Sequence, residues 1–252
     1  MALIDKIKQK KDVVLQSKNK INLKKGLTFI PNLFTLGNAF FGFCSIVFAA
    51  TGKFFPAGYF ILLGALMDAL DGRLARLFKT QSSFGVQLDS LSDVISFCLA
   101  PAFLIYVWQL KYLGFLGIIF SSIFLLAGLL RLARFNVIHE QQTLFFLGVP
   151  TTIAGCFLAT LMLNTIKIAK NDFFLIFIAF LQLLLAFLMI STIPFPTFKQ
   201  KLPNLNKNLY LVFFIILFAI IAVLQFNRVL LLLFAFYFLN TIFIYFFRFE
   251  KK

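Results

Sequence analysis

The sequence predicts an all-α fold: a polytopic membrane helix bundle of about eight transmembrane helices, with both termini in the cytoplasm. Hydrophobic residues make up 61% of the 252 residues, whereas soluble domains contain about 45–50%. Apolar runs recur along the chain, and about 20 helical residues are enough to cross about 30 Å of hydrocarbon. The 24 Lys and Arg residues fall mostly on one side of these spans, and the positive-inside rule makes that side cytoplasmic.

The elements follow one another in three parts. Residues 1–26 form a basic N-terminal segment, interpreted either as a solvated arm or as an amphipathic helix on the membrane surface. Residues 27–195 form a transmembrane core, and residues 196–252 form a C-terminal transmembrane pair with a basic tail. The expected spans lie near residues 30–51, 57–78, 84–108, 112–133, 149–168, 172–193, 209–226 and 229–247.

The formal net charge of +15 fits this topology. Basic residues at the cytoplasmic side orient the spans and are attracted to anionic lipid headgroups. We therefore expect membrane lipids around the protein and no nucleic-acid partner. The expected location is the cytoplasmic (inner) membrane of the cell, as a multi-pass protein.

Four of the nine acidic residues are expected at the cytoplasmic ends of the second and third spans. Asp68 and Asp71 are three residues apart on one helix face, and Asp89 and Asp93 are four apart on the next helix. The short link near residues 79–83 makes these helices antiparallel neighbours, so the four carboxylates are expected to converge. Converging carboxylates repel one another unless they bind cations or protons.

The ligand set indicates hard divalent ions. Oxygen-only ligands suit Mg²⁺, Mn²⁺ or Ca²⁺ rather than zinc, and His139 is the only histidine in the chain. We expect Asp68, Asp71, Asp89 and Asp93 to hold two ions, Mg²⁺ or Mn²⁺, with Ca²⁺ as a non-productive occupant. Two ions a few Å apart can clamp both oxygens of a phosphoryl displacement.

Small residues face the same gap between the two helices. Gly72, Ala75 and Gly85 leave room for a flat group to approach the backbone. The same residues also suit close packing of membrane helices, and both interpretations stay open at this stage.

The order Asp-x2-Asp-Gly-x2-Ala-Arg-x8-Gly-x3-Asp-x3-Asp, from Asp68 to Asp93, resembles the signature of the CDP-alcohol phosphatidyltransferase family. The resemblance implies transfer of a phosphatidyl-type group from a CDP-linked lipid to an alcohol, with release of CMP. It also implies a six-helix core, a site that opens to the cytoplasm and a homodimer. Residues 27–195 would then be the catalytic core. In this mechanism Asp93 is the catalytic base, and the CDP-lipid contacts are Gly72, Ala75, Arg76 and Gly85.

Further stretches resemble the phosphatidylserine synthase branch of the family, over roughly residues 28–155. They are residues 31–38, 83–102, 131–136 and 146–150. The resemblance implies CDP-diacylglycerol and L-serine as substrates. The sequence departs from the branch at Cys98, where glycine is usual, and at Thr151-Thr152, where a second proline is common after Pro150. Glycerol 3-phosphate or inositol phosphate as acceptor is the main alternative, while a divalent-cation transporter and a non-catalytic lipid-binding protein are distant ones.

Serine is a zwitterion, so its site needs a cation and neutral polar groups. Arg131 and Arg134 lie at the expected cytoplasmic end of the fourth span, where an arginine fork suits a carboxylate or a lipid phosphate. Asn32, Thr35 and Asn38 form a polar stripe on the first span. We expect all five to bind serine or phosphate. Positive-inside topology with snorkelling remains the alternative for the arginines, and helix capping for Asn32.

Overall fold

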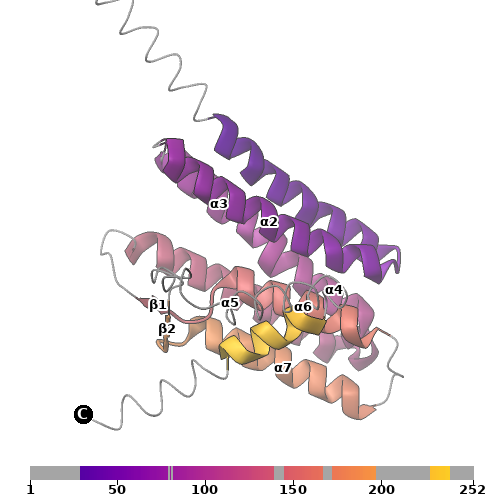
Figure 1. Ribbon diagram of the computed structural model, residues 1–252. Helices are drawn as coiled ribbons and strands as arrows, with labels where there is room; N and C mark the ends of the chain where they lie inside the picture. Colours follow the sequence, from indigo (N-terminus) through magenta and orange to yellow (C-terminus); the bar gives the residue numbers. More distant parts are fainter. Residues whose placement is uncertain are drawn as a thin grey trace, which may run out of the picture.

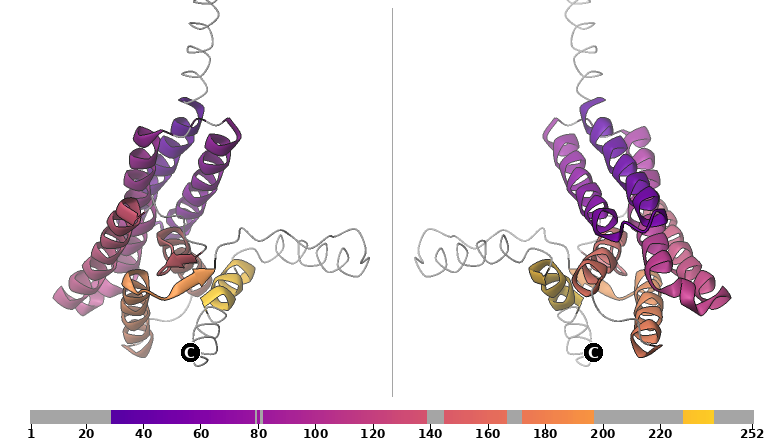
Figure 2. Two further views of the ribbon diagram at one scale, coloured as in Figure 1. Left: turned by 90° about the vertical axis from the view of Figure 1, so that its left-hand side faces the viewer. Right: turned by 90° about the vertical axis from the view of Figure 1, so that its right-hand side faces the viewer.

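The computed structural model describes residues 29–78, 80, 82–138, 145–166, 172–196 and 228–238. Within these ranges the protein is a bundle of helices with one very small antiparallel strand pair (Figure 1). The first helices (indigo and purple) lie together in the upper part of the view, and the later helices (pink, orange and yellow) lie below them (Figure 2). The predicted all-α class is confirmed for the described residues.

Three long helices form the N-terminal half. The first runs from Phe29 to Ala50, and α2 spans Phe54–Phe78. Between them Gly52 adopts a φ of 76° and its N–H donates to the Ala49 carbonyl oxygen. A left-handed residue that closes the last helical turn is best supplied by glycine, so this position fixes the tight reversal into α2.

The third long helix changes its winding in the middle. It begins as α3 (Ser83–Asp93), passes through the π-helical segment η1 (Val94–Leu99) and ends as α4 (Ala100–Trp108). Ser82 caps its start, because the Gly85 N–H donates to the Ser82 hydroxyl oxygen at 3.0 Å. Pi-helical turns inside α-helices are often found at functional sites, and this one begins directly after Asp93.

The C-terminal half contains shorter elements as well as long helices. They are the 3₁₀ turn η2 (Leu110–Leu113), α5 (Phe115–Ile138), β1 (Phe145–Leu147), α6 (Thr151–Thr165), α7 (Asp172–Ile190), β2 (Pro194–Pro196) and the helix Arg228–Phe238. β1 and β2 pair antiparallel, which joins the segment before α6 to the segment after α7. Gly148, with a φ of 75°, then turns the chain into α6, and its N–H donates to the Ile193 carbonyl oxygen at 2.9 Å.

Helix α6 lies at the centre of the packing and contacts α2, η1, α4, α5 and α7. Small residues allow these close approaches. A Cβ added to Gly58 of α2 would lie 2.8 Å from the Met162 side chain, and one added to Gly155 of α6 would lie 2.8 Å from the Phe97 carbonyl oxygen. Close packing through small residues is typical of membrane helices.

Five of the described helices are long and apolar enough to cross a membrane: Phe29–Ala50, Phe54–Phe78, Ser83–Trp108, Phe115–Val137 and Asp172–Ile190. Large apolar side chains cover their outer faces, among them Phe43, Phe173 and Phe187, which are 61%, 81% and 69% exposed. Monomeric soluble proteins rarely expose contiguous apolar surface on this scale. The protein is therefore a membrane protein.

These helices match the expected spans near 30–51, 57–78, 84–108, 112–133 and 172–193. The span expected at 112–133 begins and ends later, because η2 and Gly114, with a φ of 59°, delay the start of α5. The span expected at 149–168 is the shorter helix α6. The described helix Arg228–Phe238 overlaps the first part of the last expected span, whereas residues 209–226 and both termini lie outside the described residues. The total of eight spans therefore remains a prediction.

Candidate metal and substrate site

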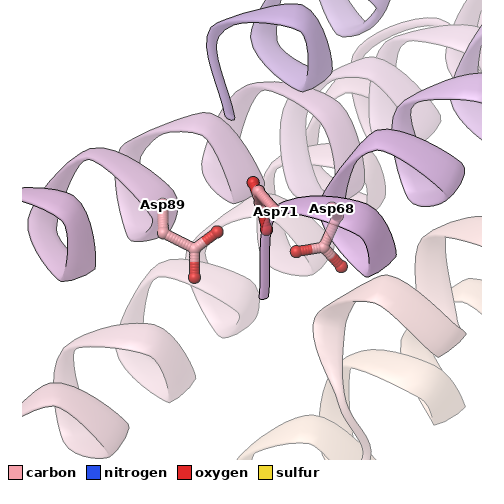
Figure 3. Close-up of side chains that lie close together, drawn as sticks. All are labelled: Asp68, Asp71 and Asp89. Atoms are coloured by element: carbon pink, nitrogen blue, oxygen red, sulfur yellow. The ribbon is translucent and has the colours of Figure 1, made fainter. Parts of the chain in front are cut away.

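Three carboxylates from two helices meet at one point. Asp68 and Asp71 lie on α2 and Asp89 lies on α3, and one oxygen from each lies within 4.8 Å of the others. Figure 3 shows the Asp68 and Asp89 carboxylates on either side of Asp71. Asp71 is only 5% exposed, and the other two are partly buried. The helix faces inferred from the spacing of these residues therefore do come together across the α2–α3 link.

The donor set fits a divalent ion. Asp71 Oδ2 and Asp89 Oδ1 are buried and have no hydrogen-bond partner among the described residues, although an unsatisfied buried oxygen is costly. A bound cation would satisfy these oxygens, and carboxylate oxygens are the ligands that Mg²⁺ and Mn²⁺ prefer. A Cβ added to Gly72, the residue after Asp71, would meet nothing within 4 Å, so there is open space beside the cluster.

Asp93 lies one helical turn beyond Asp89, beside this group of three but not within it. Its side chain is 9% exposed, and the Asn38 side-chain nitrogen donates to Asp93 Oδ1 at 3.3 Å. The charges of Asp68, Asp89 and Asp71 act on the Asp93 carboxylate. The structure thus brings three of the four expected ligands into one cluster and sets the fourth next to it.

The polar stripe of the first helix lines the acidic residues. The Thr35 hydroxyl donates to the Pro31 carbonyl oxygen at 3.1 Å and lies beside the Asp71 carboxylate. The Asn32 amide oxygen lies 3.4 Å from the position of a Cβ on Gly85. Asn32 sits inside the helix Phe29–Ala50, so it does not cap that helix.

The two arginines of α5 have different surroundings. Arg131 is 8% exposed, and its Nη1 donates to the Thr151 hydroxyl oxygen at 3.3 Å, while its Nε has no partner among the described residues. Its charge also acts on Asp93. Arg134 instead donates from Nη1 to the Ile190 carbonyl oxygen at 2.9 Å and from Nη2 to that of Ser191 at 3.2 Å. Arg131 therefore lies near Asp93, whereas Arg134 caps the C-terminal end of α7.

The residues expected to contact the CDP-lipid lie on α2 and α3, the two helices that carry the cluster. Arg76 is exposed at the end of α2, and Ala75 is partly buried one turn beyond Gly72. Gly85 lies in the first turn of α3, where an added Cβ would approach Ser82 Oγ to 3.2 Å. Gly85 is thus needed for packing, while Gly72 borders free space.

Sequence reasoning missed several contacts that shape the site. The Thr152 side chain lies beside the Asp68 carboxylate, and the Thr151 hydroxyl oxygen accepts from Arg131. The only signal for these two threonines was their departure from the usual proline. On α3, the Ser90 hydroxyl donates to Asn136 Oδ1 of α5 at 3.1 Å, which ties the residue after Asp89 to α5.

The departure at Cys98 is accommodated across the helix interface. A Cβ on Gly128 of α5 would overlap the Cys98 sulfur, so a glycine on α5 offsets the larger side chain on η1. Cys98 is buried and fills a packing position between η1 and α5.

Comparisons with known proteins concern one family model and several named relatives. The sequence model described as CDP-alcohol phosphatidyltransferase matches residues 28–246. A Helicobacter pylori protein named CDP-diacylglycerol–serine O-phosphatidyltransferase is 35% identical over 192 residues, covering 75% of this chain and 81% of the relative. A Bacillus subtilis protein of the same name is 34% identical over 175 residues, covering 69% and 93%. An archaetidylserine synthase from Methanothermobacter thermautotrophicus is 36% identical over 182 residues, covering 70% and 74%.

Proposed function

The chain belongs to the CDP-alcohol phosphatidyltransferase family, and we propose that it transfers the phosphatidyl group of CDP-diacylglycerol to the hydroxyl of L-serine. The products are phosphatidylserine and CMP. The observation that carries the proposal is the meeting of Asp68, Asp71 and Asp89 within 4.8 Å at the ends of long apolar helices. Such a site suits a reaction between a lipid-linked diphosphate and a water-soluble alcohol.

The relatives support serine as the acceptor. Two of them are named for transfer to serine from CDP-diacylglycerol, and a third is named for an archaetidylserine product. Serine is common to these names while the lipid differs. We therefore propose serine as the acceptor, and we propose a diacyl lipid as the donor because the names of the two bacterial relatives specify CDP-diacylglycerol.

The acidic cluster would hold two divalent ions, Mg²⁺ or Mn²⁺, with Asp68, Asp71 and Asp89 as the main ligands and Asp93 as a further one. When bound, the ions supply the positive charge that the diphosphate and the departing CMP require. The buried, unpartnered oxygens Asp71 Oδ2 and Asp89 Oδ1 support this assignment. Ca²⁺ would bind the same oxygens without supporting turnover.

Asp93 acts as the base in this proposal. It takes the proton of the serine hydroxyl while the serine oxygen bonds to the phosphorus of the phosphatidyl group, and the bond from that phosphorus to the CMP oxygen breaks. Burial of Asp93 and its fixed contact with Asn38 support the role, because a positioned base is more effective than a mobile one. Arg131, with its buried and unpartnered Nε, would bind the serine carboxylate.

The CDP-lipid would lie on the outer side of the cluster. The open space beside Gly72 would accept the cytidine, with Ala75 and Gly85 at its edges, and the exposed Arg76 would reach the phosphates. Lipid tails would then run between the helices into the bilayer.

The remaining features of the proposal concern the whole chain. Residues 27–195 would be the catalytic core, residues 1–26 a basic surface segment and residues 196–252 a C-terminal transmembrane pair. Eight spans would place both termini and the active site at the cytoplasmic side of the cell membrane, and the protein would act as a homodimer. The apolar lengths of five described helices and the net charge of +15 support the membrane-spanning part of this arrangement.

Product analysis tests the acceptor. Purified protein is incubated with CDP-diacylglycerol and, separately, with radiolabelled serine, glycerol 3-phosphate and inositol phosphate, and the lipids are separated by thin-layer chromatography. We expect label in the lipid only from serine, with an equal amount of CMP released. Label that enters from another acceptor and not from serine would overturn the assignment.

Asp93→Asn tests the base. Turnover should fall by about 100-fold or more, while CDP-diacylglycerol still binds. Asp172→Asn makes the same chemical change at the exposed first turn of α7 and should leave turnover unchanged. Full activity of the Asp93 variant would exclude Asp93 as the base.

A further inference from the structure

Asn38 lies deep in the packing of the first helix. Its exposed fraction is 0%, although it is a polar residue in an apolar helix. Its side-chain nitrogen donates to Asp93 Oδ1 at 3.3 Å, and its backbone carbonyl oxygen accepts from the Ser96 hydroxyl at 2.8 Å. Asn38 is therefore joined to the third helix on both sides of the point where α3 becomes η1.

Two glycines allow the close packing around Asn38. A Cβ on Gly64 of α2 would lie 2.9 Å from Asn38 Oδ1, and a Cβ on Gly42 would overlap the Ser96 hydroxyl. The amide is thus packed between α2 and η1. An exchange of its oxygen and nitrogen would place the oxygen against the Asp93 carboxylate, where two acceptors repel. In the observed orientation the nitrogen, which is a donor, faces the Asp93 carboxylate, which accepts.

Burial separates Asn38 from the substrates. A side chain with an exposed fraction of 0% cannot reach serine or the lipid phosphate without rearrangement of three helices. The sequence predicts Asn38 as a serine or phosphate ligand, but the geometry favours an action through Asp93. The amide fixes one oxygen of that carboxylate and leaves Oδ2 for a substrate.

We propose that Asn38 is a positioning residue that holds the Asp93 carboxylate in the orientation needed to take the serine proton. This inference rests on the proposed function and extends it by one residue. A positioning role predicts that Asn38 affects the rate of the chemical step and leaves substrate binding unchanged. A ligand of serine would instead affect the KM for serine.

The first test is Asn38→Leu, which keeps the branched shape of the side chain, with larger terminal groups, and removes the donor. We expect kcat to fall about 10- to 100-fold, as for the loss of a hydrogen bond to a charged group. The KM values for serine and CDP-diacylglycerol should change less than about two-fold, because neither substrate touches Asn38. An unchanged kcat, or a raised KM for serine with kcat intact, would overturn the inference.

A double-mutant cycle separates positioning from packing. If Asn38 acts only through Asp93, Asn38→Leu combined with Asp93→Asn should be no slower than Asp93→Asn alone. A further loss equal to that of Asn38→Leu in the wild-type background would contradict the proposal. Ser96→Ala is the matched control, because it removes the other hydrogen bond between the same helices and should lower stability without lowering kcat.

Folding and function are read out separately. Thermal unfolding and CDP-diacylglycerol binding are measured for each variant. Asn38→Ala, which removes the donor without adding volume, takes the place of Asn38→Leu if that variant does not fold. Asn38→Ala with wild-type kcat would equally refute the inference. A wild-type protein that transfers nothing to serine would refute the proposed function, whereas an active wild type with a fully active Asn38→Leu would refute only the role of Asn38.

Discussion

Replacing Asp71 with asparagine should stabilise the protein in the absence of divalent ions and remove the stabilisation that such ions give. Asp71, Asp68 and Asp89 have oxygens within 4.8 Å of one another. At this distance two ionised carboxylates repel by about 3.5 kcal/mol when the effective dielectric constant is about 20. Asp71→Asn removes two of the three repulsive pairs and keeps the shape of the side chain.

Relaxation of the side chains reduces this gain in the folded protein. We therefore expect at least about 1 kcal/mol of added stability without ions, which is a rise in Tm of about 2–4 °C for a chain of this size. Added Mg²⁺ should favour the wild type over the variant. It should raise the Tm of the wild type, because ligands that bind only the folded state stabilise it, and it should raise the Tm of Asp71→Asn much less.

The assay is thermal unfolding of the purified protein in detergent, with EDTA or with Mg²⁺ or Mn²⁺. Asp172→Asn serves as the control, because it removes a carboxylate at the start of α7 and should keep the wild-type response to Mg²⁺. A lower Tm for Asp71→Asn in EDTA, together with a wild-type response to Mg²⁺, would show that these carboxylates are not a cation site.

Three further predictions concern other parts of the site. Arg134→Ala should lower the free energy of unfolding by about 2 kcal/mol, because the carbonyl oxygens at the end of α7 lose their donors. It should affect the KM values of both substrates equally. A selective rise in the KM for serine would instead assign Arg134 to the serine site. Arg131→Lys keeps the positive charge but loses the forked guanidinium group. Steady-state kinetics should show the KM for serine rising about 10-fold and the KM for CDP-diacylglycerol unchanged. Equal rises in both KM values would place Arg131 at the phosphate of the lipid substrate. Gly155→Ala should lower the free energy of unfolding, measured by denaturation, by about 1–3 kcal/mol, because the new Cβ would lie 2.8 Å from the Phe97 carbonyl oxygen. An unchanged stability would contradict the close packing of α6 on η1.

The sequence was sufficient to predict the long helices and the acidic cluster. Apolar length alone identifies a membrane helix, and the spacing of Asp68, Asp71 and Asp89 places them on helix faces that a short link must bring together. These features depend on local periodicity. The end of α6 at Thr165 and the later start of α5 at Phe115 depend instead on turns that periodicity does not reveal.

Contacts between residues that are far apart in the sequence could not be predicted from local periodicity. Asn38 and Asp93 are 55 positions apart, and the side on which the first helix packs decides that they meet. Arg131 and Arg134 lie in consecutive turns of α5 and look equivalent in the sequence. The packing of α7 against α5 separates them, because the end of α7 reaches Arg134 while Arg131 lies next to Thr151.

The central claim is that carboxylates from α2 and α3 hold divalent ions at the site of transfer. Diffraction from crystals grown with Mn²⁺, with data collected at the manganese absorption edge, tests it most directly. We predict two anomalous peaks about 4 Å apart, bounded by oxygens of Asp68, Asp71 and Asp89. A fully occupied Mn²⁺ elsewhere in the protein, with these three side chains free of any peak, would contradict the account.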